Sequence, residues 1–128
     1  MSSTSLPGIA GWIVRIFVAA CFVGGAVAAV SGRLVVAGVG FLVGHTLLAG
    51  AAVIQGQRRR GLGLSLSGVG WVALAVGLGA SGAESGASLP TTPLIVGGFA
   101  LVTAGTLLVV VAFGATASEP DAAPSSEE

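Results

Sequence analysis

The sequence has few charged side chains, no lysine and no tyrosine. Only 8% of its 128 residues are charged, against roughly 25% in a typical soluble domain, and its mean hydropathy is +1.01. These values exclude an ordinary water-soluble domain. Basic and acidic residues number five each, so the chain has no basic excess of the kind that neutralises nucleic-acid phosphates. We therefore expect no nucleic-acid partner.

Reactive residue types are equally scarce. The single cysteine, Cys21, excludes an intramolecular disulfide and any cysteine-cluster metal site. The sequence contains no carboxylate pair, no nucleophile beside a base and no phosphate-binding GxxxxGK[ST] motif. We therefore expect no metal, no other cofactor and no enzymatic activity.

Four apolar stretches are each long enough to cross a membrane. A helix that crosses about 30 Å of hydrocarbon needs about 20 mainly apolar residues, because lipid offers no partner to unpaired backbone groups. The sequence thus predicts an all-α integral membrane four-helix bundle over residues 1–114. The predicted spans are residues 9–30, 34–54, 62–80 and 94–114.

Arginine in short loops marks the cytoplasmic side of a membrane protein. Arg58, Arg59 and Arg60 follow the second predicted span and are the strongest topology determinants; Arg15 agrees with them and Arg33 opposes them. We therefore expect a multi-pass protein of the cell membrane, with both termini in the cytoplasm.

The two ends of the chain carry little structural signal. Residues 115–128 are small, acidic and proline-containing, which predicts a disordered acidic tail that either solvates the terminus or docks a partner. Near the start, Ala26-Val27-Ala28 resembles a signal-peptide cleavage site. Arg15 interrupts the apolar run before it and no basic region precedes that run, so we expect no removable signal.

The second and fourth predicted spans resemble each other at an offset of sixty residues. LVVAGVGFLVGHTLLAGAAV aligns without a gap over LIVGGFALVTAGTLLVVVAF, with Gly38 over Gly98 and Thr46 over Thr106. This similarity would follow from a tandem duplication of a two-helix hairpin, with the copies related by an axis along the membrane normal. Chance identity in so restricted a residue alphabet is the alternative.

Small residues recur at helical spacing. There are 22 glycines; Gly40 and Gly44 form a GxxxG pattern, and Ala73 and Gly77 another small-residue pair. Because lipid provides little hydrophobic drive for helices to associate, such faces indicate close helix contacts. Those contacts lie within one bundle, or join it to a second subunit or a larger membrane complex.

Arg15 is the only charged residue inside a predicted span, and a charge inside the membrane is a functional candidate by default. It lies about 9 Å from the inner edge by helical rise, a distance that a guanidinium stem covers by snorkelling. We interpret it first as a snorkelling anchor. A ligand or headgroup contact and a bond to helix carbonyls are the alternatives.

His45 lies near the middle of its span, too deep to snorkel. Thr46 follows it, and Thr103 and Thr106 of the fourth span bracket its depth to within about 3 Å by helical rise. These four side chains are therefore candidates for a polar layer at the bundle centre. His45 is either a packing residue or, in such a layer, a ligand or proton-relay residue that lacks an acidic partner.

Four closely spaced spans, arginine without lysine, many glycines and alanines and a short acidic tail resemble small four-span membrane proteins of the haloarchaeal type. The size is also similar to that of small multidrug exporters, which work through a glutamate in the first membrane helix. Here Arg15 lies in that helix and no acid does, which argues against cation export.

Two functions follow from these observations. The first is a non-enzymatic packing or accessory component of a membrane assembly, which associates with lipid, with itself or with a larger complex. The second is a small transporter or channel that uses the layer around His45.

Overall fold

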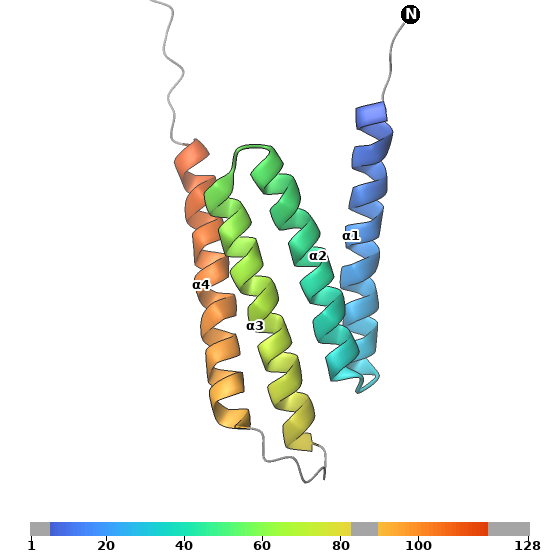
Figure 1. The fold of residues 1–128 in the computed structure, drawn as a ribbon, viewed down its shortest axis with the longest axis vertical. Coiled ribbons are helices and arrows are strands. Elements are labelled where there is room, and N and C mark those ends of the chain that lie inside the picture. The colour runs from blue at the N-terminus through green and yellow to red at the C-terminus, as the bar shows by residue number, and fades with distance from the viewer. Residues whose placement is uncertain (1–5, 83–89, 118–128) are drawn as a thin grey trace, which may run out of the picture.

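The computed structural model describes residues 6–82 and 90–117, and in that part the chain forms four α-helices and no strand (Figure 1). All four helices are long and apolar enough to cross a membrane. The predicted all-α, four-helix membrane class is thereby confirmed. The helices are α1 (Leu6–Val30), α2 (Leu34–Ile54), α3 (Arg58–Gly82) and α4 (Thr91–Ala117).

Two tight turns join the first three helices, and a glycine in a left-handed conformation makes each of them. Gly32 has φ +75° and Gly56 has φ +78°, a backbone region that other residues rarely adopt. After Gly32, the Arg33 N–H donates to the Ala28 carbonyl at 2.8 Å. In the second turn, the residue after the glycine donates in the same way to the carbonyl five residues back. These bonds satisfy carbonyl groups at the helix ends. Because both turns are so short, consecutive helices among α1, α2 and α3 run antiparallel.

The helices α1, α3 and α4 are each longer than the predicted spans, and two of these differences change the interpretation of the sequence. The third span was expected to begin at residue 62, but α3 begins at Arg58, so the three consecutive arginines lie in its first turn and not in a loop. Arginine is a good helix former, and the left-handed glycine at position 56 already ends α2. At the other end, α4 continues to Ala117, three residues into the predicted tail; residues 118–128 lie outside the described residues.

The helices form an open row. Within the described residues, α1 contacts α2, α2 contacts α3 and α3 contacts α4, and no other pair meets. Figure 1 shows α2 and α3 between the two edge helices. The first half of α1 is free of this packing, because every described side chain from Gly8 to Phe17 is exposed. The bundle is therefore not closed between α1 and α4.

The interior consists of small residues. Among the described residues, the buried apolar side chains are Val18 and five alanines, and no large side chain is fully buried. Large apolar side chains lie outside instead: Phe99 is 67% exposed and Trp12 is 66% exposed. This distribution suits a solvent of acyl chains, in which large apolar surfaces face lipid and small residues let backbones approach.

The central helix, α3, has two stripes of small residues, each with a period of seven. One stripe faces α2, where a Cβ atom at Gly61 would lie 3.1 Å from the Ala49 carbonyl. The other faces α4, where a Cβ atom at Gly70 would lie 2.7 Å from the Gly98 carbonyl. The stripes are Gly61, Gly68 and Ala75 toward α2, and Gly63, Gly70 and Gly77 toward α4.

The contact between α1 and α2 uses the predicted GxxxG pair. A Cβ atom at Gly40 would lie 3.3 Å from the Gly25 Cα, and one at Gly44 would lie 2.9 Å from the Phe22 ring. Both glycines of the pair therefore admit α1, as the small-residue pattern predicted.

We expect Gly44→Ala to destabilise the protein by about 1 kcal/mol, because its methyl group overlaps the Phe22 ring. Phe22→Leu should remove part of that overlap, so the double variant should lose less stability than the two single losses combined. Unfolding in a denaturing detergent measures all three. Gly50→Ala is the matched control, because nothing lies within 4 Å of the Gly50 Cβ position. Equal losses for the two alanine variants would contradict the assignment.

The two hairpins are not packed alike. Gly98 of α4 lies against Gly70 of α3, whereas Gly38, its counterpart at an offset of sixty, lies against Ala75 of α3 and not against α1. The dipeptide Gly11-Trp12 recurs as Gly70-Trp71 at an offset one residue shorter, yet Gly11 has no neighbour within 4 Å. The duplication thus stays a prediction, and the packing shows no matching symmetry.

Candidate functional site

His45 belongs to an aromatic cluster at the junction of three helices. Its ring meets the Phe22 ring edge-on at 5.0 Å between centroids, and Phe41 continues the cluster to Trp71 of α3 at 5.0 Å. Its Nδ1 lies 2.7 Å from the Phe41 carbonyl oxygen. A carbonyl only accepts, so Nδ1 carries the proton and donates. This environment is that of a packing residue.

The structure does not bring the predicted polar layer together. Thr103 and Thr106 lie on α4, which α3 separates from α2, and both are exposed. Each of their hydroxyls donates to a carbonyl one turn back on α4, at 2.9 and 2.8 Å, and Thr46 does the same on α2 at 2.8 Å. This is the ordinary behaviour of hydroxyls inside helices. The transporter or channel function was based on this polar layer, so the structure does not supply the geometry that this function needs.

Arg15 is exposed on the unpacked first half of α1. Every acidic residue of the chain lies outside the described residues. The interpretation of Arg15 as a snorkelling anchor stays a prediction.

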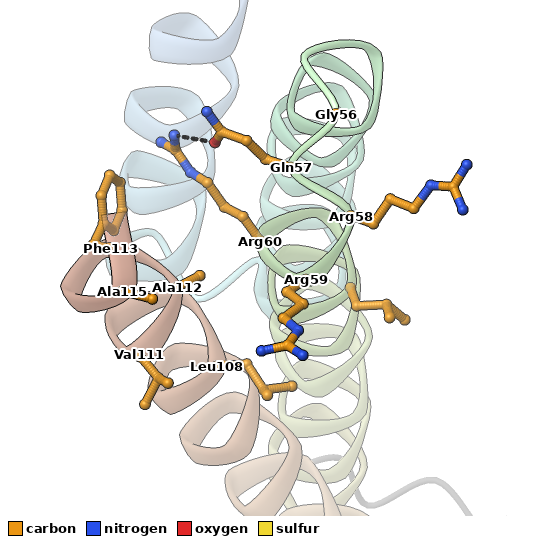
Figure 2. A pocket seen from close by; sticks show the side chains of 11 residues that line it. Gly56, Gln57, Arg58, Arg59, Arg60, Leu108, Val111, Ala112, Phe113 and Ala115 are labelled. Carbon is orange, nitrogen blue, oxygen red and sulfur yellow. Dashed lines mark hydrogen bonds between the residues drawn. The ribbon is translucent and has the colours of Figure 1, made fainter. Parts of the chain in front are cut away.

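A concave feature lies where α3 begins and α4 ends (Figure 2). It encloses about 660 Å³. One side is formed by the turn before α3 and by its first residues, and the other side by the last turns of α4. The lining residues are Gly56, Gln57, Arg58, Arg59, Arg60, Leu62, Leu108, Val111, Ala112, Phe113 and Ala115.

Arg60 is held in place from two sides in this cavity. Its guanidinium carbon lies 4.3 Å from the centroid of the Phe113 ring, a cation–π arrangement that joins α3 to α4. One terminal nitrogen donates to the Gln57 side-chain oxygen at 3.0 Å. Its Nε is buried and has no hydrogen-bond partner.

Arg58 and Arg59 are exposed. Figure 2 shows the Arg59 side chain directed toward Leu108 and that of Arg58 directed away from α4. Arg59 and Arg60 thus place two cationic groups at one cavity whose lining residues include no acid. Such a site attracts anions.

No family model, curated protein or solved structure matches this chain. Among the described residues, no group of three or more His, Cys, Asp or Glu side chains could hold a metal ion. The physical arrangement of the chain itself is therefore the basis for a functional proposal.

The cavity, and the position of the arginines in it, were not predicted. The arginines were interpreted only as topology determinants, because the cavity exists only once the end of α4 lies beside the start of α3. The signal for that arrangement was present in the seven-residue spacing of glycines in both helices, Gly63 and Gly70 in one and Gly98 and Gly105 in the other.

Proposed function

We propose that the protein is a non-enzymatic packing component of the cell membrane that pairs with a second copy of itself through α4. In this proposal both termini are cytoplasmic, and so is the turn between α2 and α3. Figure 1 supports this arrangement, because the start of α1, that turn and the end of α4 all lie at one end of the row.

The observation that carries the proposal is an unused small-residue face on an edge helix. Gly97, Ala100 and Ala104 are all exposed, and nothing lies within 4 Å of the Gly97 Cβ position. Their spacing of three and four residues puts them on one side of α4. Inside the chain, similar small faces admit neighbouring helices, so this face is suited to admit another helix.

A second copy is the partner that fits this face best. Two copies inserted in the same orientation are related by a two-fold axis along the membrane normal. Such an axis places the small residues of both α4 helices at the same depth in the membrane. The small-residue face of one α4 therefore contacts the same face of the other. The first half of α1 differs, because Ile9, Trp12 and Ile13 there are large, exposed and suited to acyl chains.

We expect the wild-type protein, extracted in a mild detergent, to have the mass of a dimer by light scattering. Ala100→Leu/Ala104→Leu should shift it to a monomer, because the added side chains prevent the backbones from approaching. Val110→Leu is the matched control, since Val110 is 59% exposed on the same helix and lies outside the small face. A wild-type monomer, or a double variant that remains a dimer, would contradict self-pairing through α4.

A further inference from the structure

We propose that the cavity between the start of α3 and the end of α4 binds an anionic phospholipid. Its phosphate headgroup lies beside Arg59 and Arg60, and the part of an acyl chain next to the headgroup lies against the apolar residues of α4. This ligand goes beyond the self-pairing proposed above, and neither proposal depends on the other.

The cavity has hydrogen-bond donors to spare. Within the described residues, the side chains of Arg58 and Arg59 form no hydrogen bond or ion pair. Phosphate oxygens accept hydrogen bonds from guanidinium groups, often two at a time. An anionic headgroup therefore supplies what this cavity lacks.

Arg60 is already oriented before any ligand binds. The Phe113 ring and the Gln57 oxygen hold its guanidinium group from two directions. Less conformational entropy is then lost on binding than for a freely rotating arginine. Arg59 is exposed and directed toward Leu108 (Figure 2). The guanidinium groups of Arg59 and Arg60 therefore enter the cavity from different directions.

The apolar side of the cavity distinguishes a lipid from a free anion. Leu108, Val111 and Ala112 line it, and the lining residues of α4 extend about 10 Å along the helix by helical rise, from Ala115 to Leu108. Because α4 ends beside the arginines, this wall leads from the charged end toward the middle of the membrane. A soluble phosphate would leave the wall uncovered, whereas an acyl chain covers it. Basic pockets beside membrane helices recognise anionic headgroups in this way.

The test compares lipids on the purified full chain in a neutral detergent. Phosphatidylglycerol, phosphatidylcholine or inorganic phosphate is added, and bound lipid is counted by native mass spectrometry. We expect the wild type to bind phosphatidylglycerol at least about tenfold more tightly than phosphatidylcholine. Inorganic phosphate should not compete with the bound lipid.

Two variants assign the preference to this cavity. Arg59→Gln/Arg60→Gln should abolish it, and Arg59→Gln alone should weaken it, with little risk to folding because Arg59 is exposed. Arg33→Gln in the opposite turn is the matched control and should retain the preference. Equal binding of the two phospholipids, a double variant that keeps the preference, or displacement by phosphate alone would overturn the proposal. The mass of the protein in the same spectra reports self-pairing separately.

Discussion

Gly98→Leu is expected to separate α4 from α3 and to cost at least about 3 kcal/mol of unfolding free energy. A Cβ atom at Gly98 would lie 2.8 Å from both the Gly70 carbonyl oxygen and the Leu74 amide nitrogen. Both atoms belong to the backbone of α3, so no side chain can rotate away. Overpacking of a well-filled core costs about 1–3 kcal/mol even where side chains can adjust. A leucine here has no such freedom.

Unfolding of the purified protein in a denaturing detergent measures this loss. Gly24→Leu is the matched control, because nothing lies within 4 Å of the Gly24 Cβ position, and it should leave the unfolding midpoint nearly unchanged. The cation–π contact between Arg60 and Phe113 also depends on this packing. Gly98→Leu should therefore weaken phosphatidylglycerol binding as well. Equal midpoints for the two leucine variants would show that the α3–α4 contact is not as close as described.

Arg58→Gln/Arg59→Gln/Arg60→Gln is expected to divide the protein between two membrane orientations. Arg15 and Arg33 are the other basic residues, and they favour opposite orientations. With the three arginines gone, the charge difference across the membrane disappears, and with it the signal that selects one orientation. A reporter enzyme that is active only outside the cytoplasm, inserted after Glu84, should be fully active in the wild type and about half as active in the variant.

A charge-preserving variant separates topology from recognition of the headgroup. Lysine determines orientation as arginine does, so Arg58→Lys/Arg59→Lys/Arg60→Lys should keep the reporter outside. It should nevertheless bind phosphatidylglycerol less well, because an ammonium group cannot form the paired bonds of a guanidinium group. An inactive reporter in the wild type would place Glu84 in the cytoplasm and reverse the proposed orientation.

The membrane helices could be predicted from the sequence because their physical cause is local. A run of apolar residues must form a helix in lipid whatever its neighbours are, and the bounds of α2 were predicted to the residue. The start of α3 was missed because charged residues were assigned to the loop. Backbone conformation, and not charge, decides where α3 begins: the helix can start as soon as the left-handed Gly56 has ended α2.

The arrangement of the helices could not be predicted in the same way. His45 and Thr106 lie at similar depth, but depth does not say which helices are neighbours, and α3 lies between theirs. Gly68 shows what decides which helices become neighbours. A Cβ atom there would lie 2.9 Å from the Cβ of His45, so the absence of a side chain on α3 makes room for the histidine. Such pairwise fit depends on two distant residues at once.

The open row has a consequence for how the protein is made. Each described helix packs only against the helix before it and the helix after it, so no contact has to wait for a distant part of the nascent chain. α2 can dock on α1 as soon as it leaves the insertion machinery, and α3 and α4 can follow in the order of synthesis. Because local contacts favour fast assembly, we expect this chain to assemble vectorially, one helix after another, with α4 completing the headgroup cavity last.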